Sequence, residues 1–171
     1  MKTAVVYYSL DGSTRMAAQV LAERFEADVF ELKETKQRKK GFALFVLGGF
    51  AASTGRKSRV QDTFVDRMGG YDFICIGTPI WASSPVPAVN TFADTLDPAD
   101  KQVMLFTVQA DPNTSSPPGK RAEQLCAVLR EKGGSVLPIL RMNGNSPGQT
   151  ATKEHIEKQL EQKLEAVLQK R

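Results

Sequence analysis

A short polar loop near the N-terminus carries the first side chains that could do chemistry. Ser9, Gly12, Ser13 and Thr14 stand between a run of β-favouring residues and a helical pattern. Hydroxyls and free backbone N–H groups at a helix N-terminus bind anions without the help of a lysine, and glycine allows the tight backbone path. The loop is therefore a candidate phosphate site, and ordinary helix capping by the same residue types is the alternative.

A second candidate loop follows an apolar strand pattern and covers residues 77–87. Its sequence is GTPIWASSPVP, and Trp81 is the only tryptophan in the chain. A loop tryptophan among small residues is a natural platform for a flat aromatic ligand. The alternative is that the indole packs into the core beneath the loop.

Other nucleotide, phosphate and metal sites are disfavoured by the motifs that the chain lacks. No G-x-G-x-x-G motif follows the first strand pattern, which argues against a dinucleotide site of that kind. The sequence GRKS at 55–58 looks like the end of a P-loop. However, position 50 holds no glycine, and Arg56 stands where the P-loop lysine should be. Cys75 and Cys126 form no CxxC pair and His155 is the only histidine, so we predict no metal site and no catalytic side chain.

Hydrophobic periodicity places these loops between alternating strands and helices. Apolar β-favouring runs predict five strands, at residues 3–8, 28–32, 71–77, 102–108 and 135–141. Apolar residues spaced three and four apart predict helices at 14–26, 60–68, 85–96, 120–132 and 150–169. This alternation indicates an α/β, doubly wound parallel sheet. In such sheets ligands bind beyond the carboxyl ends of the strands, where the strand order reverses.

The first loop and its flanks resemble the signature of flavodoxins and flavodoxin-like flavoproteins. The similar residues are VVYYSLDGST at 5–14, followed by Ala18 and Leu21, and residues 77–81 are similar to flavin loops of the same family. The resemblance implies a flavodoxin-like fold: one domain over residues 1–171, three α/β/α layers and a five-stranded parallel sheet in the order 2-1-3-4-5.

The same resemblance implies FMN as the cofactor, held by three loops. For the phosphate loop it implies Ser9, Leu10, Asp11, Gly12, Ser13 and Thr14. For the loop that borders the ribityl chain and the isoalloxazine ring it implies Thr78, Pro79, Ile80, Trp81 and Ala82. For backbone contacts from the third loop it implies Gln109, Ala110 and Asp111.

Two departures from the family pattern affect the implied site. Asp11 replaces the threonine that is common in electron-carrier flavodoxins, and it adds negative charge to the phosphate loop. No aromatic residue follows Phe106, so the third loop offers no ring to cover the second face of a flavin. That face would be open, or another part of the chain would cover it.

Residues 33–60 interrupt the alternation and form a predicted basic and apolar insertion. Between 35 and 61 the chain has seven basic residues and no acidic one, whereas the rest of the chain has a net charge of −3. The apolar stretch from Phe42 to Phe50 has four interpretations: a helix packed on the sheet, a lid over the ligand, a peripheral membrane contact of the 36–59 segment, or a dimer surface.

Length and composition exclude several classes of protein. A chain of 171 residues with 41% hydrophobic and 25% charged residues fits one soluble globular domain. Its longest apolar stretch is too short to span a bilayer, so we expect a cytoplasmic protein with no transmembrane segment, either a monomer or a homodimer. The net charge of +4 arises from the basic insertion on a mildly acidic remainder, and it is no argument for nucleic-acid binding.

The sequence leaves three functions open. The first is a flavodoxin-like redox protein that transfers electrons through FMN to or from a redox partner protein. The second is a NAD(P)H-dependent reductase of quinones or other small acceptors. The open ring face favours it, and so does the net charge of +4, because carriers of the resembled family are strongly acidic. The third is a flavin-free binding module of the same fold.

Overall fold

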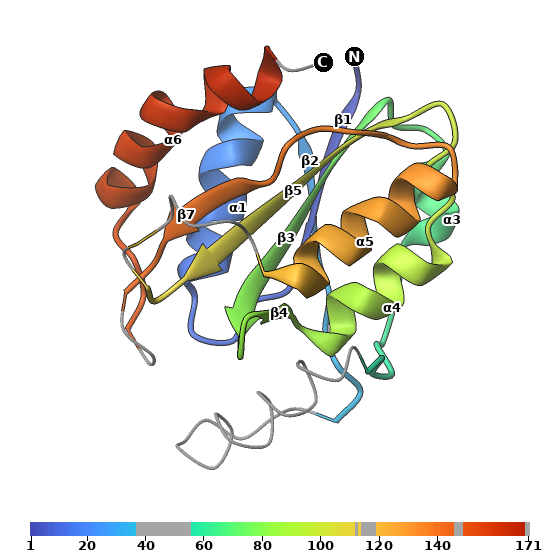
Figure 1. Ribbon diagram of the computed structural model, residues 1–171, viewed down its shortest axis with the longest axis horizontal. Helices are drawn as coiled ribbons and strands as arrows, with labels where there is room; N and C mark the ends of the chain where they lie inside the picture. The colour runs from blue at the N-terminus through green and yellow to red at the C-terminus, as the bar shows by residue number, and fades with distance from the viewer. Residues whose placement is uncertain (37–55, 112, 114–118, 146–148, 170–171) are drawn as a thin grey trace.

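The protein forms one layered α/β structure, seen here in a computed structural model that describes residues 1–36, 56–111, 113, 119–145 and 149–169 (Figure 1). Its strands are β1 (Thr3–Tyr7), β2 (Asp28–Glu31), β3 (Phe73–Trp81), β4 (Ser84–Pro85), β5 (Gln102–Gln109), β6 (Ser135–Val136) and β7 (Leu140–Asn143). Its helices are α1 (Ser13–Phe25), α3 (Val65–Met68), α4 (Pro87–Thr95), α5 (Lys120–Glu131) and α6 (Lys153–Leu168).

A twisted parallel sheet runs through the middle of the molecule in the order β2-β1-β3-β5-β6. β7 also pairs with β5 in parallel, further along the same edge, so β6 and β7 together fill the fifth position of the sheet. The predicted order 2-1-3-4-5 is thus confirmed. The fifth strand, predicted as one piece, consists of two segments with Pro138 between them. Proline has no N–H to donate to the ladder, so the strand is interrupted at this residue.

Both faces of the central strands are buried, and different helices cover them. Ala4 and Val6 of β1 pack with apolar residues of α3, α4 and α5. Val5 and Tyr7 of the same strand face α1 and α6 on the other side (Figure 1). Burial on both sides explains why the strands appear in the sequence as continuous apolar runs rather than alternating ones.

The connection after β3 differs from the prediction. We predicted a strand that ends at residue 77 and a helix that opens at Pro85, but β3 continues to Trp81 and β4 turns back to pair with it. The helix α4 begins only at Pro87, where proline fits a first turn. The cause is a tight hairpin whose two tip residues, Ala82 and Ser83, have φ angles of 45° and 59°.

Glycine at position 119 allows this hairpin to rest against the start of α5. A Cβ atom on Gly119 would lie 2.2 Å from the carbonyl oxygen of Ser83, a distance that no side chain tolerates. The hairpin tip is therefore held between its own strand pairing and the N-terminus of α5.

Two further helices are shorter than predicted. The helix expected at 60–68 is limited to the four residues of α3. The helix expected from 150 begins at Lys153, and Thr152 caps it: the Thr152 hydroxyl accepts a hydrogen bond from the His155 backbone N–H at 3.3 Å. Residues 149–151 instead pack against the first loop.

The predicted insertion is closed at its base by an antiparallel bridge between Glu34 and Val60. The Thr35 N–H donates to the Arg59 carbonyl at 2.9 Å, and the Gln61 N–H donates to the Lys33 carbonyl at 2.8 Å. The stretch from Phe42 to Phe50, with its four interpretations, lies outside the described residues. Within the described part of the chain, no helix has both the length and the apolar character needed to cross a membrane.

Candidate functional site

Three loops that leave the carboxyl ends of β1, β3 and β5 meet at one cleft. The volume of this cleft, which is open to solvent, is about 50 Å³. The lining residues are Asp11, Ser13 and Thr14 from the first loop, Pro79, Ile80 and Trp81 from the second, Val108, Gln109 and Ala110 from the third, and Gly144 and Asn145 after β7. The structure therefore brings together the three loops that the sequence singled out, at the point where the strand order reverses.

The first loop presents the uncapped N-terminus of α1. Gly12 is the N-cap residue, with φ at 101°, and no described side chain caps this end of the helix. The Ser9 hydroxyl accepts a hydrogen bond from the Gly12 N–H at 3.2 Å and shapes the loop just before the helix. The helix-capping alternative is therefore wrong, and the N–H groups of the first turn can serve an anion.

Gly12 also permits a close contact with the segment before α6. A Cβ atom at this position would lie 2.7 Å from the Thr150 hydroxyl oxygen. That hydroxyl donates a hydrogen bond to the Asp11 carbonyl at 2.5 Å. Residues 149–151 are thus a fourth element that fixes the first loop.

The Ser13 hydroxyl has a structural role that the sequence did not predict. Ser13 is buried, and its hydroxyl donates to the Gln149 carbonyl at 3.2 Å and accepts from the Ala151 N–H at 3.0 Å. This double hydrogen bond ties α1 to the segment before α6. Only the backbone N–H of Ser13 then remains for the phosphate contact that the resemblance implies.

The second loop gives the cleft an aromatic wall. Trp81 is half-buried, and its ring meets the Tyr8 ring edge to face, with centroids 6.0 Å apart and planes at 87°. The indole also packs against the edge of the hydrophobic core. Trp81 therefore both packs against the core and lines the cleft.

Thr78 and Ala82 do not line the cleft. Thr78 is fully buried, and its hydroxyl donates to the Pro79 carbonyl at 2.8 Å and accepts from the Val86 N–H at 3.1 Å. Ala82 is exposed at the tip of the hairpin. Ser9, Leu10, Gly12 and Asp111 are likewise absent from the lining.

The third loop is held by side-chain amides. Gln109 Nε2 donates to the carbonyls of Asp111 and Asn113, each at 3.3 Å, and its Oε1 accepts from Arg141 at 3.0 Å. Asn143 Nδ2 donates to the carbonyls of Gln109 and Ala110, at 3.3 and 3.1 Å. The backbone of Gln109 and Ala110 is thereby fixed at the edge of the cleft.

Asn143 is itself anchored by α6. Its N–H donates to Gln159 Oε1 at 2.8 Å, and its carbonyl accepts from Gln159 Nε2 at 2.8 Å. His155 Nε2 lies 3.1 Å from the same carbonyl, and His155 is exposed, as expected. Lys163 Nζ donates to the Arg141 carbonyl at 3.0 Å, and burial, with Arg141 nearby, lowers the pKa of Lys163.

Residues at the end of β7 and just after it were missed by the sequence prediction. Asn143 is the last residue of β7, Gly144 and Asn145 line the cleft, and Thr150 fixes the first loop. The sequence from 143 to 150 is rich in glycine and asparagine. The fifth strand also ends at the ligand-binding edge of the sheet. The turn-forming residues that follow it were therefore the signal that could have identified these positions.

Neither cysteine supplies a nucleophile. Both are buried, which confirms their prediction as small core residues. Burial raises the pKa of the Cys126 thiol to about 11 and raises the pKa of Cys75 as well, so neither is a thiolate near neutral pH. Among the described residues, no group of three or more His, Cys, Asp or Glu side chains is placed to hold a metal ion.

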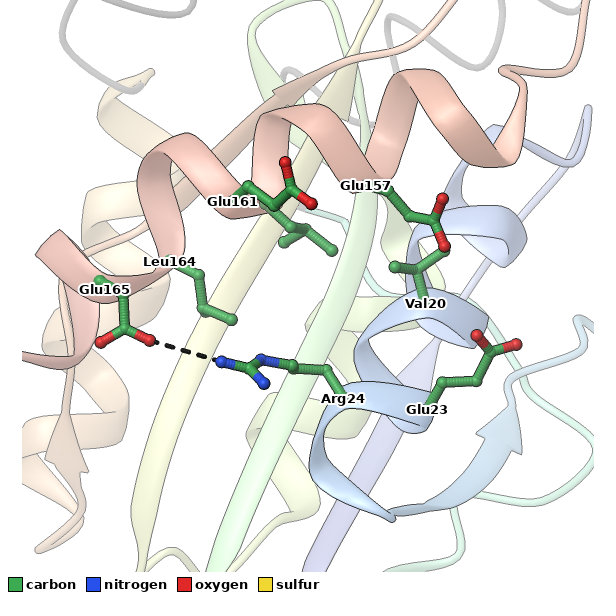
Figure 2. A pocket seen from close by; sticks show the side chains of 8 residues that line it. Val20, Glu23, Arg24, Glu157, Glu161, Leu164 and Glu165 are labelled. Carbon is green, nitrogen blue, oxygen red and sulfur yellow. Dashed lines mark ion pairs between the residues drawn. The ribbon is translucent and has the colours of Figure 1, made fainter.

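A larger groove of about 570 Å³ lies between α1 and α6 (Figure 2). Three of its four acidic lining residues form ion pairs. Arg24 spans the groove to Glu165 at 3.6 Å (Figure 2). Lys153 contacts Glu23 at 2.7 Å and Glu157 at 3.8 Å. The floor residues of the groove, Leu160 and Leu164, are buried in the core. Exposed ion pairs over a closed core offer no group for chemistry, so we place the candidate site in the cleft.

Comparison with known proteins places the fold. No family model matches the chain, and no curated protein matches it by sequence. Among solved structures, a Bacteroides uniformis protein with a provisional flavoprotein assignment has a TM-score of 0.69 and 23% identity, over 94% of this chain and 97% of that one.

Two other structures extend the comparison. An archaeal flavodoxin has a TM-score of 0.62 and 17% identity, over 99% of this chain and 98% of that one. A Lactobacillus acidophilus flavoprotein in complex with FMN has a TM-score of 0.56 and 19% identity, over 83% of this chain and 91% of that one. These likenesses show that the chain has a flavodoxin-like fold.

The Ser13 tie generates a stability prediction. The Ser13→Ala variant leaves the buried Ala151 N–H without its acceptor, so we expect the free energy of unfolding to fall by about 1–3 kcal/mol. Urea unfolding followed by circular dichroism measures it. The matched control is Ser135→Ala on an exposed side chain, with an expected change within about 0.5 kcal/mol. Equal losses in the two variants would contradict the structural role of Ser13.

Proposed function

We propose that this protein binds FMN non-covalently and acts as a flavodoxin-like redox protein. The observation that carries the proposal is the convergence of three loops, from neighbouring strand ends, on a cleft with an uncapped helix N-terminus and the chain's only tryptophan. The likeness in fold to a flavoprotein that contains FMN supports it.

The phosphate group fits the start of α1. Gly12 N–H is already engaged by Ser9, and the following first-turn N–H groups have no side-chain cap. Oriented N–H groups and the positive end of the helix dipole favour a dianion. Arg15 is paired with Glu31 and also bonds Tyr7, and the Glu31 contact is the main reason that the pKa of Arg15 is raised. The backbone is therefore the principal ligand.

The ring system would lie over the open mouth of the cleft, beside Trp81. Pro79 and Ile80 continue the apolar wall, while Gln109 and Ala110 border the opposite side. The hydrogen bonds from Asn143 fix that opposite side, so its backbone groups are preorganised for a planar ligand. Asp11, the one carboxylate in the lining, has its carbonyl held by Thr150.

The chemistry comes from the cofactor and the positioning comes from the chain. When bound, FMN supplies one-electron and two-electron transfer. Among the residues that the structure describes, those that line the cleft include no thiol, histidine or lysine. The chain therefore binds the phosphate, orients the ring, and shields one of its faces with Trp81.

Trp81 provides the direct test of this site. Purified protein, mixed with FMN and desalted, should retain the visible absorption bands of the flavin. Trp81→Ala should raise the FMN dissociation constant about tenfold, since an aromatic stacking contact is lost. It should also raise the potential for full reduction, because stacking on an indole disfavours the electron-rich ring.

The matched control keeps an aromatic wall. Trp81→Phe should hold the dissociation constant within about threefold of the wild-type value. A wild-type protein that stays colourless after desalting would contradict the proposal and leave the flavin-free binding module. An unchanged reduction potential in Trp81→Ala would show that Trp81 does not contact the flavin ring.

A reductase is the second candidate, favoured by the absence of any aromatic residue after Phe106 in the sequence. An uncovered ring face is what hydride transfer from a nicotinamide requires. We expect the FMN-loaded protein, if it is a carrier that needs a redox partner protein, to show almost no steady turnover with NAD(P)H and a quinone. Sustained turnover, in which each protein molecule reduces many quinone molecules, would identify the protein as an NAD(P)H-dependent reductase.

A further inference from the structure

We propose that Glu34 is a positioning residue that holds Trp81 at the cleft by way of Tyr8. The expected effect on FMN binding rests on the proposed function, because Trp81 is the proposed wall for the flavin ring. Glu34 is not among the residues that line the cleft, and no motif in the sequence predicts a role for it. It stands at the base of the predicted insertion, where its backbone bridges to Val60.

The first link is a hydrogen bond between two buried side chains. Glu34 and Tyr8 are 6% and 7% exposed, and the Tyr8 hydroxyl donates to Glu34 Oε2 at 3.3 Å. A carboxylate is withdrawn from water only at a large penalty unless polar partners compensate for the lost hydration. The tyrosine hydroxyl is one such partner, so the side chain is held in this position rather than turned outward.

The second link is the contact between the two aromatic rings. Tyr8 follows β1 directly, and its N–H donates to the Gly77 carbonyl of β3 at 3.1 Å. With its backbone fixed on β3 and its hydroxyl fixed on Glu34, the Tyr8 ring has a defined orientation. Trp81 meets that ring at 87°, an edge-to-face geometry that depends on the orientation of both partners.

The base of the insertion and the ring wall are therefore joined by a continuous path. It runs from the Glu34–Val60 bridge through the carboxylate and the tyrosine to the indole. Gln61 Nε2 donates to the Glu34 carbonyl at 3.5 Å and adds a side-chain hydrogen bond to the two backbone bonds across the same bridge. A change that loosens Glu34 should thus be felt at Trp81, although the two side chains belong to different loops.

The chain offers a readout that needs no cofactor. Because Trp81 is the only tryptophan, fluorescence of the full-length protein, excited at a wavelength that tyrosine does not absorb, reports on this residue alone. In Glu34→Ala and in Tyr8→Phe we expect acrylamide quenching of Trp81 to rise roughly twofold, since the edge-to-face partner is no longer held. Glu34→Gln keeps an oxygen acceptor for the tyrosine hydroxyl and should restore the wild-type quenching.

A second tyrosine–carboxylate bond in the protein is the matched control. The Tyr71 hydroxyl donates to Asp28 Oδ2 at 2.8 Å, and the ring contact described for Tyr71 is with Phe30. Asp28→Ala removes the same kind of bond and should leave Trp81 quenching unchanged. Equal effects of Asp28→Ala and Glu34→Ala, or no effect of Glu34→Ala and Tyr8→Phe, would overturn the proposal.

FMN binding separates this inference from the function on which it rests. In a protein that retains FMN, Glu34→Ala should raise the dissociation constant about three- to tenfold, with Glu34→Gln close to the wild type. Normal FMN binding and normal quenching in Glu34→Ala would reject the positioning role alone. A wild type that fails to retain FMN, with altered quenching in Glu34→Ala, would reject the proposed function and keep the Glu34–Tyr8–Trp81 path.

Discussion

Burial of both faces of the central strands is the constraint on which the rest of the structure depends. Val5 and Val6, neighbours in β1, pack into two different cores on opposite sides of the sheet. Most side chains along β1, β3 and β5 are therefore committed to packing, and the threonine Thr78 within β3 is itself fully buried. The cleft lies beyond the carboxyl ends of these strands, where loops from three neighbouring strands converge without opening a core.

The loops at that edge are held by contacts between segments distant in sequence. Ser13 and Thr150 join the start of α1 to the segment before α6, and Asn143 joins the third loop to α6. The hairpin after Trp81 is fixed by its pairing with β3 and by the close approach of Gly119. A site assembled in this way presents backbone N–H groups and one aromatic wall in fixed positions, which is what a preorganised binding site needs.

The strands and the three loops could be predicted because they follow from local signals, whereas the strand order was implied by the resemblance to flavodoxins. Continuous apolar runs gave the strands, and turn residues after them marked the loops. The hairpin was missed because Ala82 and Ser83 are unusual residues for positive φ, and because Pro85 is equally suited to a helix start. The hydroxyl contacts of Ser13 and the amide contacts of Asn143 join positions far apart in the chain, and no pattern within one segment encodes them.

Binding of the flavin phosphate at the uncapped N-terminus of α1 is tested by the ratio of two dissociation constants. Titration of the flavin-free protein with FMN and with riboflavin, followed by quenching of flavin fluorescence, gives both constants. We expect FMN to bind more tightly by on the order of a hundredfold, since the phosphate contributes several charge-assisted hydrogen bonds. Equal affinity for the two flavins would contradict it.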